Sequence, residues 1–387
     1  MKIAFESQLL LNGNKTGIAW CADNLIRGIA KSTDYECQLN YFSKGCDEEK
    51  LAAMREYQAV GAKLKPCGFF KMPWYKFIWL FLPLPYHWFF RSDCQITQFF
   101  NYVIPPGVKG KKVTFIYDMV HYACRDTMRL KNRIWLDLTL KQSCQRADIV
   151  LTISEFSKSE IIKYLKVPEE KIRVIYMGVD LELFHDGYAQ AEIEQAKAKY
   201  KISGEYILYL GTIEPRKNLQ RLIEAYELLV RSKRAEDLPK LVLAGGKGWL
   251  CDDIYRAAEK PELQGKVLFA GYIDEQDSPL LLSGAKFFCF PSLYEGFGMP
   301  PIEAMACGTP VLAGEAASLP EVIGNAGVLV NPYSVEEISE AMKNLIEDEK
   351  QRKDLAQRGL RRAEQFAWQN SVNTLKNIYE TLMNGEE

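Results

Sequence analysis

The sequence predicts an α/β protein made of two doubly wound domains. Short apolar runs, rich in β-branched and aromatic residues, alternate with helical patterns along almost the whole chain. Strands this apolar are typical of parallel sheets that helices cover on both faces. The length of 387 residues suits two domains of roughly 150 residues or more each. A stretch poor in apolar residues, 178–192, separates two series of such elements and marks the boundary.

Five strands are expected in each series. They are 2–5, 94–100, 112–118, 147–154 and 172–178 in the first series, and 205–211, 240–246, 266–272, 286–292 and 310–314 in the second. Helical patterns lie between them, and beyond Val335 the sequence predicts only helix. We expect an N-terminal domain at 1–180, a C-terminal domain at 190–365, and a helix at 366–387 that returns to the first domain. Functional loops follow the strand C-termini, so the two domains are expected to face a central cleft.

Composition excludes several classes of function. The formal net charge of −1 gives no basic field for nucleic acid. Ten cysteines form no CxxC pair, and three scattered histidines predict no metal site. The opening "MKIAF" lacks the charged region and long apolar core of a signal peptide. We therefore expect a cytoplasmic protein that needs no cofactor.

The segment 69–91 is unusually aromatic, with Trp74, Trp79 and Trp88 close together. Its charge-free run is too short for a bilayer, which needs roughly 20 apolar residues. The segment is either a buried helix and loop, a surface for an acceptor or a second subunit, or an interfacial patch. If the segment is an interfacial patch, its flanking cations favour contact with a membrane surface. We would then expect the protein at the inner face of the cell membrane.

One candidate anion site lies in "YLGTIEPRKNLQRLIEA" (209–225), where a strand passes through Gly211 into a helix. The dinucleotide fingerprint GxGxxG and the GxxxxGK[ST] loop are both absent. Arg216 and Lys217 instead precede the helix, which Asn218 is expected to cap. Arg grips two oxygens at once and Lys supplies a point charge, which suits a diphosphate. A solvated loop is the alternative for an isolated Arg-Lys pair.

A second candidate anion site follows the strand at 286–292. The glycines of "EGFGMPP" (295–301) free main-chain N–H groups at the start of a helix, whose dipole favours anions. Glu295 can accept hydrogen bonds from sugar hydroxyls. Glu303, one turn into the helix, can hold a ribose diol, and its apolar neighbours indicate burial that demands a partner.

The stretch "PSLYEGFGMPPIEAMACGTPV" (291–311) resembles family 4 of the retaining glycosyltransferases, which have the GT-B fold of two Rossmann-like domains. The similarity extends to "GTIEPRKNL" (211–219), "ASLPEVIGNAGVLVNP" (317–332), "FAWQNS" (366–371) and the N-terminal "TGIAWCADNLIRGIA" (16–30). It therefore touches both halves of the chain. The mannosyltransferase-like, polysaccharide-assembling subgroup is the most similar.

The resemblance implies a nucleotide-diphosphate sugar, GDP-mannose or a UDP-hexose, bound mainly by the C-terminal domain. Arg216 and Lys217 would bind the diphosphate, Glu303 the ribose and Glu295 the sugar hydroxyls. Other donor-binding residues that it implies are Gly17, Gly211, Gly296, Phe297, Gly298 and Met299.

The acceptor side is matched less fully. The family often carries His-Asp at the end of the strand at 112–118, and here Tyr117 precedes Asp118. Asp118 is the better candidate to orient the acceptor hydroxyl. His121 is a second candidate for catalysis, with an exposed helical histidine as the alternative.

The implied activity is retaining, metal-independent transfer of a hexose, mannose first, to a glycan or lipid-linked acceptor in cell-surface polysaccharide assembly. A catalytically silent GT-B protein that binds or regulates a partner, and a sugar-nucleotide epimerase, are the alternatives. The oligomeric state is not indicated.

Overall fold

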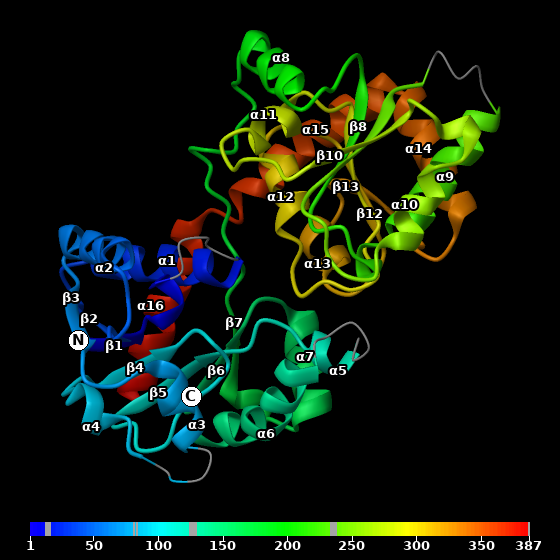
Figure 1. The fold of residues 1–387 in the computed structure, drawn as a ribbon. Coiled ribbons are helices and arrows are strands. Elements are labelled where there is room, and N and C mark those ends of the chain that lie inside the picture. The colour runs from blue at the N-terminus through cyan, green and yellow to red at the C-terminus, as the bar shows by residue number, and fades with distance from the viewer. Residues whose placement is uncertain (12–16, 80–81, 83, 124–129, 233–237, 386–387) are drawn as a thin grey trace. The chain divides into compact units, whose positions relative to one another are not determined.

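The computed structural model describes residues 1–11, 17–79, 82, 84–123, 130–232 and 238–385. The chain divides into two compact units, Met1–Gly178 with Trp368–Glu387, and Val179–Ala367 (Figure 1). Each unit is an α/β layer structure around one parallel sheet, and each is described by itself.

The first unit contains, within the described residues, a seven-stranded sheet in the order β3-β2-β1-β4-β5-β6-β7, with every pair parallel. Its strands are β1 (Lys2–Glu6), β2 (Glu36–Phe42), β3 (Lys63–Cys67), β4 (Ile96–Phe99), β5 (Lys111–Phe115), β6 (Ile149–Thr152) and β7 (Ile172–Val174). Its helices are α1 (Gly17–Ala30), α2 (Glu48–Arg55), α3 (Met72–Trp79), α4 (His87–Phe90), α5 (Val120–Ala123), α6 (Leu130–Arg146), α7 (Glu155–Leu165) and α16 (Trp368–Asn384).

The C-terminal helix α16 completes the first unit by packing against α1 (Figure 1). Small residues allow the close approach, because a Cβ on Gly28 would lie 2.3 Å from Val372. A Cβ on Gly178 would lie 2.4 Å from the ring of Trp368. The Ser371 hydroxyl also donates to the Tyr176 carbonyl oxygen at 2.8 Å. Helix and domain are thus joined by packing that larger side chains would block.

The second unit contains, over its described part, a six-stranded parallel sheet in the order β10-β9-β8-β11-β12-β13. Its strands are β8 (Tyr206–Leu210), β9 (Lys240–Ala244), β10 (Val267–Gly271), β11 (Phe287–Phe290), β12 (Val311–Gly314) and β13 (Gly327–Val330). Its helices are α8 (Gln190–Lys199), α9 (Leu219–Ser232), α10 (Asp252–Ala258), α11 (Ser278–Ser283), α12 (Met299–Ala306), α13 (Leu319–Ile323), α14 (Val335–Glu347) and α15 (Glu349–Glu364).

The predicted α/β class with two doubly wound sheets is confirmed, although three strands were not expected. β2 carries two polar residues, the half-buried Gln38 and the buried Asn40, which interrupt its apolar pattern. β3 is an edge strand of mostly exposed residues, and β13 spans only four residues. Edge and short strands bury too little surface for a clear sequence signal.

The aromatic segment 69–91 divides between core and surface. Tyr75, Trp79, Tyr86 and Phe90 are buried. The exposed aromatic patch, as we define it, consists of Phe69, Trp74, Leu82 and Trp88, each about 60% exposed. In the part of the chain that the structure describes, no helix is long and apolar enough to cross a bilayer.

The strand order creates a switch point in each sheet. In the second unit β8 lies between β9 and β11, so the chain leaves β8 in one direction and β11 in the other. The loops after β8 and β11 therefore open beside each other at the carboxyl edge of the sheet. Ligands of doubly wound proteins bind at such a point.

Candidate active site

The two candidate anion sites of the sequence meet at the switch point of the second unit. Arg216 and Lys217 lie in a short 3-10 turn, Pro215–Lys217, between β8 and α9. Glu295 lies between β11 and α12, on the neighbouring loop. Strand order alone brings these segments together, since they are almost 80 residues apart in the chain.

Glu295 is the centre of the cluster. The Lys217 Nζ lies 2.6 Å from its Oε1, and the Arg216 Nη1 lies 3.0 Å from its Oε2. Lys217 and Glu295 are 9% and 8% exposed. Each carboxylate oxygen thus faces one cation in a nearly dry setting, where charge-assisted bonds are strong.

A second carboxylate fixes the orientation of Arg216. Its Nη2 and Nε bind the Glu214 Oε1 at 2.7 and 3.1 Å, and its Nη1 donates to the Tyr294 carbonyl oxygen at 2.6 Å. Glu214 is 2% exposed. The cluster of Glu214, Arg216, Lys217 and Glu295 has two charges of each sign, so it offsets its own desolvation without a ligand.

The electrostatics of Glu295 follow from these contacts. Burial disfavours its charged form, but the neighbouring Lys217 and Arg216 outweigh that effect, so the pKa of Glu295 lies below its ordinary value. The carboxyl is therefore ionised at neutral pH and holds both cations in place.

Main-chain hydrogen bonds join the two loops around the cluster. The Leu293 N–H donates to the Arg216 carbonyl oxygen at 2.9 Å. The Asn218 side-chain amide donates to the carbonyl oxygens of Pro291 and Pro332, at 3.1 and 2.6 Å. Asn218 adopts a left-handed conformation, with φ of 61°. The expected helix cap was wrong, because this side chain ties loops together instead.

The Ser318 side chain holds the glycine-containing turn 295–298 by hydrogen bonds. Its buried hydroxyl lies 3.0 Å from the Glu295 carbonyl oxygen and 2.9 Å from that of Phe297. This hydroxyl therefore anchors two carbonyl groups of the turn that carries Glu295.

Gly298 begins helix α12 in a conformation that requires glycine. Its φ is 105°, and a Cβ there would lie 2.7 Å from the Leu319 side chain. Pro300 and Pro301 follow and lack N–H groups. The donors at the start of the helix are thus the amides of Gly298 and Met299, where the helix dipole is positive.

Glu303 lies one turn into α12 and is half-buried. Burial raises its pKa to about 7, and the nearby Glu275 carboxylate adds to that rise. This carboxyl is therefore partly protonated at neutral pH. A hydroxyl pair that donates to it would supply the partner its environment lacks.

The other glycines predicted to bind the donor, and Phe297, lie outside the ion cluster itself. Gly211 has φ of 151° and follows β8, where its carbonyl oxygen would clash with any Cβ on Gly245. Gly296 and Phe297 are buried in the turn itself. In the first unit, Gly17 is exposed at the start of α1, and residues 12–16 before it lie outside the described residues.

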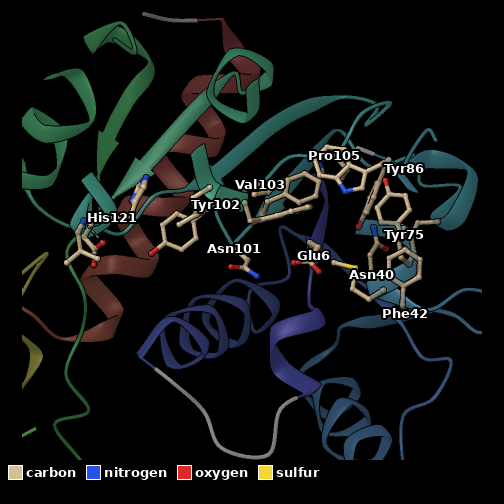
Figure 2. A pocket seen from close by; sticks show the side chains of 18 residues that line it. Glu6, Asn40, Phe42, Tyr75, Tyr86, Asn101, Tyr102, Val103, Pro105 and His121 are labelled. Atoms are coloured by element: carbon tan, nitrogen blue, oxygen red, sulfur yellow. Dashed lines mark hydrogen bonds between the residues drawn. The ribbon is translucent and has the colours of Figure 1, made fainter. Parts of the chain in front are cut away.

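Asp118 and His121 follow β5 in the first unit and line one pocket (Figure 2). Asp118 is half-buried, and its Oδ1 accepts a hydrogen bond from the Val120 N–H at 3.1 Å. His121 is only 1% exposed, so the alternative of an exposed helical histidine was wrong. Its ring lies 4.5 Å from that of Tyr122.

Sequence reasoning missed Glu214, a member of the cluster, and Ser318, which bonds to the turn beside it. Glu214 stands two positions before Arg216 and could have been found as a third charge in the "IEPRK" turn. Ser318 left no signal, since one serine beyond β12 resembles any other. Among the described residues, no group of three or more His, Cys, Asp or Glu side chains is arranged to hold a metal ion.

Removing the Ser318 hydroxyl should destabilise the second unit. Ser318→Ala leaves two buried carbonyl oxygens without this donor, so we expect the free energy of unfolding to fall by about 1–3 kcal/mol. Urea denaturation measures the change. Ser371→Ala, which frees one carbonyl in the first unit, is the matched control with a smaller loss. A midpoint unchanged by Ser318→Ala would contradict the role given to this hydroxyl.

Two family models match the chain. Residues 191–362 match the model described as "Glycosyl transferases group 1", and residues 16–183 match "Glycosyltransferase Family 4". The "O-antigen chain mannosyltransferase B" of Escherichia coli is 34% identical over 73% of this chain and 73% of its own length. The "Serotype-specific mannosyltransferase WbdA" of the same organism is 34% identical over 59% of this chain, which spans only 28% of that protein.

Solved structures show the same fold. A sucrose-phosphate synthase from Thermosynechococcus elongatus is 18% identical, with a TM-score of 0.73 over 100% of both chains. The Anabaena protein Alr3699/HepE, solved with UDP and glucose, is 18% identical, with a TM-score of 0.70 over 99% of this chain and 100% of its own. On the strength of both domain models and the 34% identity, this chain belongs to the family 4, group 1 glycosyltransferases, with the GT-B fold.

Proposed function

We propose that the protein transfers a hexose from a nucleotide-diphosphate sugar to a glycan or lipid-linked acceptor in the assembly of a cell-surface polysaccharide. Mannose is the first choice of sugar and GDP-mannose of donor, with a UDP-hexose next. The mannosyltransferase names of relatives at 34% identity support this choice. We further propose that the anomeric configuration is retained and that no metal ion takes part.

The buried cluster around Glu295 is the observation that carries the proposal. It presents two cations, and the amides of Gly298 and Met299 start a helix beside it. A diphosphate needs such a set of donors, and Arg216 and Lys217 give the positive charge that a divalent cation supplies elsewhere. A solvated loop, the alternative for these cations, does not fit the burial of Lys217 or the ion pairs of the half-buried Arg216.

In the proposed transfer step, negative charge develops on the diphosphate as it leaves. The bond from the anomeric carbon to the diphosphate oxygen breaks, and its electron pair leaves with the diphosphate. Arg216, Lys217 and the turn amides stabilise the growing negative charge. The acceptor oxygen bonds to the carbon on the face that the diphosphate leaves, and its proton passes to the departing phosphate. Asp118 and His121 are proposed to orient the acceptor hydroxyl.

Neutralising Lys217 should abolish most of the transfer. Because one donor to the leaving group is lost, we expect Lys217→Met to lower kcat by about 10²-fold or more. Product release from GDP-mannose and UDP-hexoses, with and without EDTA, measures it, and NMR of the product gives the anomeric configuration. EDTA should not lower the wild-type rate.

Lys260→Met is the matched control, because Lys260 also pairs with a buried carboxylate, Glu227, at 2.5 Å. It should cost stability but leave kcat unchanged. Near-wild-type turnover of Lys217→Met would contradict the proposal. Binding of the donor without any turnover would instead favour a catalytically silent protein, and release of an isomerised sugar nucleotide would favour an epimerase.

Donor affinity should depend on pH through Glu303. With a pKa near 7, Glu303 must lose its proton to accept bonds from a ribose diol. We expect the affinity for GDP-mannose to rise about tenfold per pH unit below 7 and to level off above it. Calorimetry between pH 5.5 and 8.5 measures the slope, and Glu303→Gln should bind weakly with no slope in this range.

The effect on stability has the opposite sign. The folded protein keeps the Glu303 proton above pH 4.5, the ordinary value at which the unfolded chain releases it. This stabilising contribution is therefore complete below pH 4.5 and is lost as pH rises through 7. A wild-type donor affinity that is flat across the range would contradict the assignment of Glu303 to the ribose.

We also propose that the exposed aromatic patch contacts a membrane surface that carries the acceptor. Lys71 and Arg91, which lie in the same segment of the sequence, are exposed and supply the cations that an interfacial surface requires. Wild-type protein should bind vesicles of anionic phospholipid, more weakly at high salt. Trp74→Ser with Trp88→Ser should reduce binding by about tenfold. Trp249→Ser, which removes a 47% exposed Trp of the second unit, is the control. Equal binding by both variants would contradict the proposal.

A further inference from the structure

The stretch "FAWQNS" (366–371) lies where the chain returns from the second unit to the first. The chain passes between the units at two places, 178–179 and 367–368, which we call the crossings. Within the second unit, the Val179 N–H donates to the Phe366 carbonyl oxygen at 2.7 Å. Val179 also forms a parallel bridge with Ala367. The main chain of Phe366 and Ala367 therefore ties one crossing to the other.

The side chain of Phe366 connects the crossings to the turn 295–298. Its ring packs against that of Phe297, with the centroids 5.6 Å apart and the planes at 82°. This is the edge-to-face geometry that aromatic pairs prefer. Phe297 and Phe366 are 3% and 4% exposed. The turn that carries Glu295 therefore rests on the same residue whose carbonyl oxygen holds Val179.

Arg362 links Phe366 to the turn by a second route. Its guanidinium carbon lies 4.8 Å from the centroid of the Phe366 ring. Its Nε donates to the Val322 carbonyl oxygen at 2.9 Å, and its Nη2 to that of Glu321 at 2.6 Å. Both carbonyls belong to α13, and this helix starts directly after Ser318, whose hydroxyl holds the turn. The ring of Phe366 is thus fixed by groups that are themselves tied to the turn.

These contacts have an energetic consequence for the crossings. A ligand that binds the turn orders it, and an ordered turn favours each contact that needs it in place. The contact of Phe297 with Phe366 is one of these, and a fixed Phe366 favours the hydrogen bond from Val179. Linkage is reciprocal, so a change that loosens this contact must weaken ligand binding by the factor by which the ligand stabilises it.

We propose that Phe366 is a positioning residue that couples donor binding at the turn 295–298 to the two crossings, acting through Phe297. An occupied donor site then protects the crossings against local opening, and an empty site releases that protection. The inference rests on the proposed function for its ligand, a nucleoside diphosphate group, but not on the identity of the sugar. A Phe366 that only fills the core is the alternative.

Hydrogen exchange measures the coupling. The full-length protein is exchanged with and without saturating GDP or UDP, and mass spectrometry follows peptides over 176–182, at one crossing, and 293–299, at the turn. In the wild type the nucleotide should slow exchange of both peptides by about fivefold or more. Phe366→Leu keeps an apolar side chain but loses the ring. The nucleotide should still slow exchange at its turn, no longer at its crossing, and bind about fivefold more weakly by calorimetry.

The matched control is Phe269→Leu in the second unit. The Phe269 ring lies 4.5 Å from that of Tyr255, and its strand β10 is separated from β11 by β9 and β8. This variant loses a comparable aromatic pair, so it should lower the denaturation midpoint. It should keep both the nucleotide affinity and the protection of the crossing, which separates coupling from stability. Phe297→Leu, which removes the other ring of the pair, takes the place of Phe366→Leu if the latter does not fold.

Two results with nucleotide would overturn the inference: protection of the crossing in Phe366→Leu equal to that in the wild type, or wild-type protection of the turn without the crossing. If neither nucleotide binds the wild type, the proposed function fails, and the ligand-free samples decide the inference. Phe366→Leu should then speed exchange of both peptides by about fivefold, and Phe269→Leu that of neither. Equal ligand-free exchange in the wild type and Phe366→Leu would show that the ring does not link turn and crossing.

Discussion

The buried contact of Glu295 with Lys217 and Arg216 is the interaction on which the site depends. Removing one partner of a buried ion pair typically costs about 3–5 kcal/mol, because a charge is left without compensation. The chain tolerates the buried Lys217 and the half-buried Arg216 here only because Glu214 and Glu295 face them at 2.6–3.0 Å. The carboxylates thus keep the anion-binding groups assembled before any anion arrives, which is the preorganisation that electrostatic catalysis requires.

Sheet topology is what makes this contact possible. β8 and β11 are neighbours at the switch point, so two loops almost 80 residues apart in sequence share one edge. Asn218 and Ser318 then fix these loops through carbonyl oxygens rather than through side-chain packing. The same strand order recurs in the first sheet, where the equivalent edge has an aromatic pocket in place of an ion cluster. One architecture therefore offers two sites of contrasting polarity.

The sequence predicts the central strands and the anion-binding residues of this protein better than its edge strands and long-range contacts. Central strands such as β8 and β11 are buried on both faces, so their apolar runs are easy to recognise in the sequence. Gly298, whose conformation requires glycine, and the consecutive cations Arg216 and Lys217 are equally easy to recognise. Edge strand β3 is mostly solvent-exposed, and β2 contains the buried polar residue Asn40, which breaks its apolar run. Ser318 matters only through carbonyl oxygens more than 20 positions away in the chain, and a single-sequence pattern does not contain those distances.

The two glutamates of the "EGFGMPPIE" stretch show how the environment divides one residue type into two roles. Glu295 and Glu303 are eight residues apart, and burial opposes ionisation of both. Lys217 and Arg216 reach only Glu295, so its pKa falls below the ordinary value, whereas Glu303 has the like charge of Glu275 nearby and a pKa of about 7. The first is a fixed charge that positions cations. The second remains adjustable, and a hydroxyl-bearing ligand would complete its ionisation.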